Sequence, residues 1–363
     1  MAAVKHLHEQ DEVTVRTIPA TRFAAIGWLV LALVIAATAA WELRMRTLGL
    51  HAGDLDDSKW HWAVERRKLA SGDHDDVVII GSSRMLFDTD LDVWEEMTGR
   101  RPLQLALVGT NPRPVLLRLA DDTDFKGLLV VDVTPDLYFM DRFSYLPQYE
   151  KILDFWQDES PSERVGHQIG LVLSGRLAFL DEAYRLAPLI ERIDIPDRPD
   201  VRRPYLEVWK LAEHSADRQT RMWPRLITDY RLRDHARLVW GPFDGTGPSP
   251  ESVTRAIEES KAAVTKIRER GGEVVFVRPP SAGLYYENEL HFAPRAKTWD
   301  RLLAETGAFG IHFEDYPAMQ NLEVPEWSHL SPESATRFTR AYVGVLRERY
   351  VGLRPGAVLH PRP

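Results

Sequence analysis

Apolar residues form one long uninterrupted run near the start of the chain. Residues 23–41 carry no charge and a single hydroxyl, that of Thr38. A helix of this length, rising 1.5 Å per residue, nearly matches the ~30 Å hydrocarbon layer of a bilayer. Trp28 and Trp41 lie towards the ends of the run, where aromatic side chains favour the membrane interface. The pattern predicts a transmembrane helix over 23–41.

The same run could instead belong to a cleaved signal peptide. Ala37-Thr38-Ala39 fits the small-x-small rule for cleavage, but the apolar part of a signal peptide is only about 7 to 15 residues long. We therefore expect an uncleaved anchor. Basic residues stand on both sides of the run and do not fix its orientation: Lys5, Arg16 and Arg22 precede it, and Arg44 and Arg46 follow it.

Further along, short apolar runs alternate with helical patterns. The runs predict buried strands at 76–80, 103–107, 128–133, 273–277 and 311–313. Amphipathic spacing predicts helices over 91–97, 115–119 and 251–270 between them, and one more after Ser331 and Pro332, which fit the N-cap and first position of a helix. This alternation is typical of an α/β fold with a doubly wound, five-stranded parallel sheet.

The alternation is interrupted over 141–248, which predicts a helical insertion. Ser160-Pro161-Ser162-Glu163 is a capping box with proline at the first helical position, and Ile169, Leu171, Val172 and Leu173 follow it. We favour a packed helical subdomain over a lid that grips substrate. The expected organisation is a tail (1–22), an anchor (23–41), a connector (42–72), an α/β domain (73–353) with this insertion, and a second tail (354–363).

Composition narrows the possible partners. The 363 residues carry a net charge of −8, with a pI near 5.9, whereas nucleic-acid binders usually show a net basic face. We expect no nucleic-acid partner. The chain has no cysteine, which excludes disulfides and thiolate chemistry. It also shows no metal-ligand spacing, no Gly-x-Gly-x-x-Gly and no Walker-type loop, so we expect no metal and no cofactor.

Two short motifs carry candidate chemistry. Gly81-Ser82-Ser83-Arg84 directly follows the first predicted strand, and ligands of open α/β sheets bind beyond the carboxyl ends of the strands. Glu326-x-x-His329 precedes the last predicted helix, and a carboxylate at this spacing can accept the imidazole Nδ1–H and leave Nε2 as a base. Taken alone, the first motif could equally cap a helix or cradle a phosphate, and His329 could be a solvent-facing loop residue.

Taken together, these motifs resemble the SGNH/GDSL hydrolase family, whose flavodoxin-like fold carries a Gly-Asp-Ser block after the first strand and an Asp-x-x-His block before the last helix. The resemblance implies Ser83 as nucleophile, His329 as base and Glu326 in place of the aspartate. It implies an oxyanion hole formed by the backbone N–H groups of Ser83 and Gly109. The family's Gly-x-Asn-Asp block is absent after the third strand, and we expect Asn111 to substitute for that asparagine.

The N-terminal anchor and the Gly-Ser-Ser-Arg variant are similar to the bacterial cell-envelope branch of the family, which includes proteins of alginate O-acetylation and teichoic acid D-alanylation. This likeness implies an esterase or acyltransferase on the outer side of the bacterial cell membrane, acting on acylated carbohydrate or an acyl donor, with a membrane-bound acyltransferase as possible partner. Arg84 and Arg278 are candidates either for binding an anionic substrate or for salt bridges. The alternative function is a non-catalytic binding or assembly component of an envelope polysaccharide machine.

Overall fold

The computed structural model describes residues 23–71, 76–121, 124–141, 149–185, 190, 210–240, 247–351 and 360–361. The chain divides into two compact units, Met1–Leu50 and His51–Pro363. The predicted tail 1–22 lies outside the described residues, as do most residues of the predicted tail 354–363.

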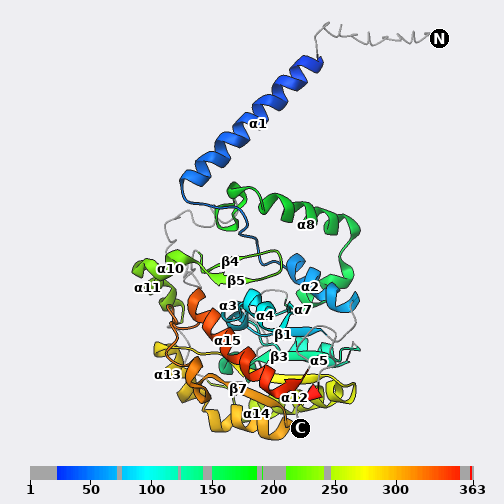
Figure 1. Ribbon diagram of the computed structural model, residues 1–363, viewed down its shortest axis with the longest axis vertical. Helices are drawn as coiled ribbons and strands as arrows, with labels where there is room; N and C mark the ends of the chain where they lie inside the picture. Colours follow the sequence, from blue (N-terminus) through cyan, green and yellow to red (C-terminus); the bar gives the residue numbers. More distant parts are fainter. Residues whose placement is uncertain are drawn as a thin grey trace, which may run out of the picture. The chain divides into compact units, whose positions relative to one another are not determined.

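The first unit contains a single described helix, α1 (Phe23–Thr47), which is long and apolar enough to cross a membrane (Figure 1). Its apolar side chains are exposed along its length, for example Trp28 at 71% and Leu33 at 62%. The helix continues six residues past the predicted end at Trp41, into a charged last turn where Arg46 pairs with Glu42 at 2.6 Å.

The second unit is built on a five-stranded parallel sheet. Its strands are β1 (Val77–Ile80), β2 (Leu103–Gln104), β3 (Leu128–Asp132), β6 (Glu273–Arg278) and β7 (Phe309–His312), in the order β2-β1-β3-β6-β7. Counted within the sheet this is 2-1-3-4-5, the order of flavodoxin-like doubly wound sheets. The predicted α/β class with a five-stranded parallel sheet is confirmed.

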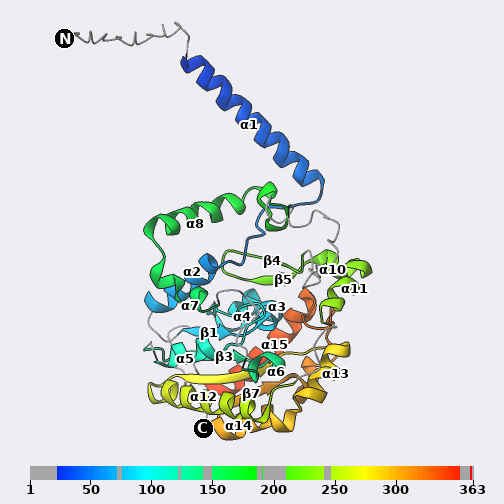
Figure 2. The same cartoon turned by 180° about the vertical axis from the view of Figure 1, so that it is seen from behind.

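Helices cover both faces of the sheet and enclose two hydrophobic cores (Figures 1 and 2). One face packs against α2 (Lys59–Ser71), α5 (Arg113–Asp121), α12 (Pro250–Glu269) and α14 (Trp299–Thr306). The other packs against α3 (Ser83–Asp88), α4 (Leu91–Thr98) and α15 (Pro332–Arg349). Ser249 and Ser331 cap α12 and α15 as their sequences predict, each followed by proline at the first helical position.

The predicted connector 42–72 is in large part folded into the second unit. Within it, α2 buries Trp62 and Leu69 in a hydrophobic core. The Trp62 indole N–H donates to the Leu105 carbonyl at 3.1 Å. The sequence of α2 mixes charged and aromatic residues and has only a few apolar positions. Its pattern therefore did not indicate a helix that packs into the hydrophobic core.

The insertion contains more than helices. Its described elements are α7 (Tyr149–Asp158), α8 (Pro161–Ser174), η1 (Ala178–Leu180), η2 (Glu182–Tyr184), the antiparallel strands β4 (Ala212–His214) and β5 (Thr220–Met222), α10 (Pro224–Thr228) and α11 (Tyr230–Val239). The expectation of an all-helical insertion is thus corrected by the β4–β5 ribbon. The capping box at the start of α8 is present as its sequence predicts.

The ribbon is fixed to the edge of the main sheet by a buried arginine. Arg218 donates to the carbonyls of Gln104 and Ala106, at 2.7 and 2.8 Å, and pairs with Asp57 at 2.7 Å. Backbone carbonyls beyond an edge strand need donors when they are buried, and Arg218 supplies them. The insertion is therefore continuous with the sheet at this point.

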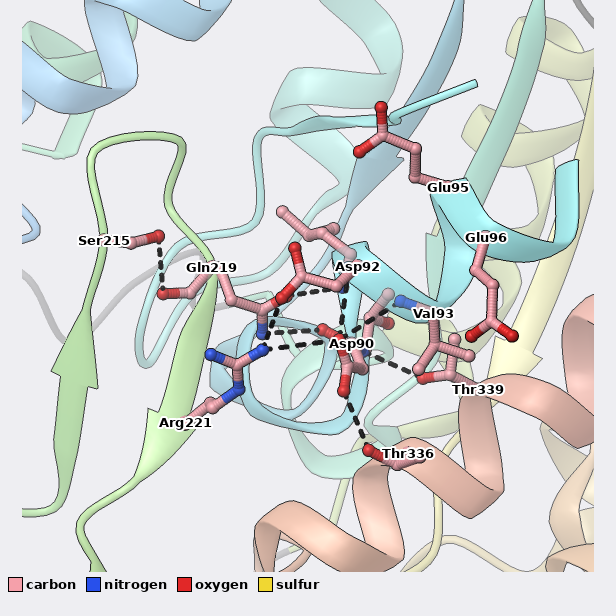
Figure 3. Close-up of polar contacts among 12 residues, drawn as sticks. Asp90, Asp92, Val93, Glu95, Glu96, Ser215, Gln219, Arg221, Thr336 and Thr339 are labelled. Carbon is pink, nitrogen blue, oxygen red and sulfur yellow. Dashed lines mark hydrogen bonds and ion pairs between the residues drawn. The ribbon is translucent and has the colours of Figure 1, made fainter. Parts of the chain in front are cut away.

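A second attachment lies where α4 begins (Figure 3). The Asp90 carboxylate caps α4 and accepts from the Thr336 hydroxyl at 2.8 Å, and the Asp90 backbone N–H donates to the Thr339 hydroxyl oxygen at 2.9 Å. From the ribbon, Arg221 pairs with Asp92 at 2.6 Å. This corner joins α4, α15 and β5.

Short elements complete the described fold: α6 (Pro135–Tyr138), α13 (Gly283–Phe292), η3 (Arg295–Lys297), η4 (Phe313–Asp315), η5 (Pro317–Met319), and the antiparallel pair β8 (Tyr350–Val351) and β9 (His360–Pro361).

Candidate functional site

The turn after β1 is held against the end of β3. A side chain at Gly81 would place its Cβ 2.5 Å from the Cβ of Asp132, so only glycine fits this approach. Ser82 donates to Asp132 Oδ2 from its N–H at 2.9 Å and from its hydroxyl at 2.6 Å. Ser82 Oγ also lies 2.9 Å from the Thr134 hydroxyl. The Ser82 side chain therefore has a structural role in joining two strand ends.

Ser83 differs from its neighbour. It is the first residue of α3 and is 8% exposed. Neither its hydroxyl nor its backbone N–H makes a hydrogen bond to any of the described residues. Of the two serines, Ser83 is the one whose hydroxyl is available for chemistry.

The second motif forms a buried carboxylate–imidazole pair. Glu326 Oε1 accepts from His329 Nδ1 at 3.0 Å and from the His329 backbone N–H at 2.5 Å, while Glu326 Oε2 accepts from the Trp240 indole N–H at 2.7 Å. Burial acts to raise the pKa of the Glu326 carboxyl, but the charge of His329 and these hydrogen bonds outweigh it and lower the pKa below its ordinary value. The pair therefore presents an ionised carboxylate to Nδ1.

The other ring nitrogen, His329 Nε2, is buried and has no hydrogen-bond partner in the described part of the chain. With Nδ1 donating to Glu326, Nε2 is an acceptor. An imidazole oriented by a carboxylate, with its second nitrogen unpaired, can take a proton from a neighbouring hydroxyl.

Helix α3 brings the two motifs together. The Phe87 ring stacks on the His329 ring, with 4.2 Å between centroids and 24° between planes. Phe87 is one helical turn after Ser83, so both side chains lie on the same face of α3. Next to His329, the Leu330 N–H donates to Asp88 Oδ1 at 2.8 Å. The imidazole thus lies against the helix face that begins with Ser83.

Gly109 occupies the turn after β2. The Leu107 N–H donates to the Gly81 carbonyl at 2.9 Å, which places this turn beside the turn that leads to Ser83. Gly109 has φ 62°, in the left-handed region that favours glycine, and its N–H makes no hydrogen bond within the described ranges. Its amide is therefore available as a donor.

Asn111 does not have a free donor. Its amide nitrogen donates to the Tyr138 carbonyl at 3.2 Å and to the Met140 carbonyl at 3.4 Å, and its Oδ1 accepts from the Arg113 N–H at 2.9 Å. Both amide hydrogens hold the loop in place, so the expected oxyanion role of Asn111 is corrected to a structural one. Sequence spacing could not reveal this, because both acceptors lie about thirty residues away in the chain.

Arg84 and Arg278 converge on one buried carboxylate, that of Glu289. Arg84 Nη1 lies 2.8 Å from Oε1, and Arg278 Nη2 lies 2.6 Å from Oε2. Burial acts to raise the pKa of Glu289, but the two arginines outweigh it and lower the pKa. The salt-bridge reading holds for both arginines. Arg84 keeps Nε and Nη2 without partners among the described residues, while its guanidinium lies 4.6 Å from the centre of the Tyr285 ring.

A cavity of about 30 Å³ lies beyond the ends of β6 and β7, lined by Arg278, Glu289, Arg295, His312 and Glu314, among others. Its size suits one or two water molecules. No group of three or more His, Asp or Glu side chains in the described ranges converges as metal ligands would.

The sequence did not single out Phe87, Asp88, Trp240 or Glu289. Phe87 and Asp88 follow the serine motif at helical spacing, so they could have been placed on α3. Trp240 and Glu289 come from distant segments, and no local pattern in the sequence connects either residue with the two motifs.

Neither models of protein families nor curated protein sequences match this chain.

Proposed function

We propose that this protein is a membrane-anchored serine O-acyl esterase or O-acyltransferase of the SGNH type. One observation carries the proposal: an imidazole fixed by Glu326 through Nδ1, with Nε2 unpaired, lies on the face of α3 that begins with Ser83. The position of Ser83 at the carboxyl end of β1, in a sheet of order 2-1-3-4-5, agrees with the SGNH resemblance.

In this mechanism the Ser83 hydroxyl attacks the acyl carbonyl carbon as His329 Nε2 takes the hydroxyl proton. Glu326 stabilises the imidazolium that forms, and the N–H groups of Ser83 and Gly109 donate to the developing oxyanion. The imidazolium then protonates the leaving alcohol, which yields an acyl-serine. Water or a sugar hydroxyl attacks this ester as Nε2 takes its proton, and the imidazolium then returns a proton to Ser83 Oγ as the acyl group leaves.

The substrate class rests on the resemblance to the cell-envelope branch. We propose acyl esters of envelope carbohydrate as substrate or product, with a membrane-bound acyltransferase as a partner that supplies acyl groups. The apolar helix α1 supports a single-pass anchor, and the domain from His51 onwards would lie outside the cytoplasm.

A serine-directed fluorophosphonate probe tests the chemistry without knowledge of the substrate, because labelling requires an activated nucleophile. Full-length wild type in detergent should label, and Ser83→Ala should not. Ser82→Ala is the matched control and should retain much of the labelling, because its hydroxyl is bonded to Asp132. Labelling that persists in folded Ser83→Ala would place the nucleophile elsewhere.

His329→Ala should lose labelling almost as severely as Ser83→Ala, because members of a catalytic triad act as a unit. The change removes a ring stacked on Phe87, so folding is checked by the thermal midpoint of each variant. A folded His329→Ala that labels at the wild-type rate would remove His329 from the mechanism.

The second candidate function is a non-catalytic binding or assembly component of an envelope polysaccharide machine. It is favoured by the commitment of the Asn111 amide to two backbone carbonyls, which leaves the expected third oxyanion donor missing. Loss of one such donor costs about 2.7 to 4 kcal/mol of transition-state stabilisation. Folded wild type that never labels would support this candidate.

A further inference from the structure

Helix α8 presents its apolar residues to solvent. Val165, Ile169, Val172 and Leu173 are each roughly half exposed, between 46% and 56%. At about 100° per residue these four side chains fall within an arc of roughly 100°, the width of stripe that a helix normally buries against a core. In α8 this stripe is the exposed side.

The opposite side of α8 is the one that contacts the fold. Ser174 is buried, and the His167 ring packs edge-on against the His61 ring of α2, with 4.8 Å between centroids. Both residues lie roughly 180° around the helix from the apolar stripe. Figures 1 and 2 show α8 at the periphery of the second unit, with α2 beside it. The helix is thus amphipathic with its apolar side facing outwards.

The carboxyl end of α8 is tied to the segment that follows the transmembrane-type helix. The Gly53 N–H donates to the Ser174 carbonyl at 3.0 Å. Gly53 is the sixth residue after Thr47, where α1 ends, and six residues span at most about 20 Å. If α1 crosses a bilayer, this short chain keeps the end of α8 near its surface.

We propose that α8 is an interfacial helix that inserts its apolar stripe into the surface of the bilayer in which α1 is anchored. The occupant of this face is lipid, because the stripe points away from the fold and the chain itself holds α8 close to the membrane. Arg164, whose side chain is 47% exposed, lies outside the stripe and can meet lipid headgroups. The inference rests on the anchoring by α1 and is independent of the proposed serine chemistry.

The absence of cysteine allows a direct test with single-cysteine variants of the full-length chain. Ile169→Cys carries an environment-sensitive fluorophore on the stripe. Gln168→Cys is the matched control on the same helix, about 90° from the centre of the stripe. Lys261→Cys, at an exposed position on α12, is the control distant in sequence. The proteins are reconstituted in liposomes of phosphatidylcholine and phosphatidylglycerol, and quenching is measured with nitroxide-labelled lipids and with aqueous iodide.

We expect the Ile169 fluorophore to be quenched by lipid nitroxides at a depth of about 5 to 10 Å and protected from iodide. The Gln168 fluorophore should respond less to the lipid quencher and more to iodide, and the Lys261 fluorophore to iodide alone. If iodide quenches the Ile169 fluorophore as strongly as that of Lys261, the stripe faces water and the proposal is wrong. Protection from both quenchers would also overturn it, because protein would then cover the stripe. None of these readouts depends on Ser83, so failure here and failure of the serine chemistry are distinguishable.

Discussion

Several buried polar atoms of α3 and of residues that interact with it lack partners in the described residues. They include His329 Nε2, Arg84 Nε and Nη2, Asp88 Oδ2 and Asp136 Oδ1. A buried polar group without a partner costs about 1–3 kcal/mol, so such groups are rare where packing alone decides the sequence. At the proposed site these atoms can form hydrogen bonds with a ligand or with water.

A substitution at Trp240 can test whether the Glu326 carboxylate is positioned for catalysis. Trp240→Phe keeps an aromatic ring but removes the N–H that donates to Glu326 Oε2. That hydrogen bond contributes to the lowered pKa of Glu326, so its loss should raise this pKa. In a plot of the probe-labelling rate against pH, the acid limb should therefore move to higher pH. Trp327→Phe is the control, because its indole N–H donates to none of the described residues. Unchanged acid limbs in both variants would contradict a positioning role for Trp240.

His312 should make stability depend on pH. Burial, together with the charges of Arg278 and Arg295, lowers the pKa of His312 to about 3. Between pH 6.5 and about 3 the unfolded chain binds a proton that the folded chain does not, so the free energy of unfolding falls as pH falls, by up to about 1.4 kcal/mol per pH unit.

In detergent, the unfolding free energy of His312→Asn should depend less steeply on pH between 4 and 6.5 than that of wild type. His291→Asn, at an exposed position on α13, is the control. Equal slopes for wild type and His312→Asn would show that His312 is not the group responsible.

At the scale of elements, the insertion is joined to the sheet by specific polar contacts. Arg218 reaches the edge carbonyls beside β2 from the β4–β5 ribbon, and Trp240, just after α11, reaches Glu326. Because the insertion contributes to the placement of the site, it is more than an appended layer.

The two arginines of the ribbon provide a matched pair for testing this attachment. Arg218→Met leaves Asp57 and two carbonyls without their donor, and breaking a buried pair in this way costs about 3–5 kcal/mol. Arg221→Met removes an ion pair of a 47% exposed side chain, where about 0–1 kcal/mol is typical. Thermal midpoints in detergent should therefore fall much further for Arg218→Met. Similar decreases would mean that the buried contacts do not anchor the ribbon.

At the scale of the whole molecule, an apolar helical unit is followed by an α/β unit of mixed polarity. The charges beside α1 do not decide its direction, since basic residues stand at both ends. The proposed chemistry on envelope carbohydrate requires the α/β unit outside the cytoplasm.

Topology can be measured with reporter fusions after His51 and after Pro363. Alkaline phosphatase, which is active only outside the cytoplasm, should be active at both positions, and a reporter that works only in the cytoplasm should be inactive at both. Activity of the cytoplasmic reporter at both positions would overturn the proposed topology. Detection of a mature chain that lacks 23–41 would restore the signal-peptide reading.

The α/β class, the five strands of the main sheet and the starts of several helices could be predicted from the sequence alone. Buried strands can be recognised in the sequence as runs of Val, Ile and Leu. Helix caps such as Ser249, Ser331 and Asp90 are also local signals, because each cap interacts with residues within one helical turn. The Glu326–His329 contact was predictable for the same reason, since its spacing lies within a single loop.

Which polar side chains already have hydrogen-bond or ion-pair partners could be learned only from the folded chain. Ser82 is bonded to Asp132, Asn111 to carbonyls near α6, and Arg84 and Arg278 to Glu289. These partners are between 11 and 205 residues apart along the chain, and a hydrogen bond depends on distances of about 3 Å that no local pattern encodes. The outward-facing stripe of α8 is a further example, because the capping box and the apolar run after it predicted a helix but only the packing showed which side faces the fold.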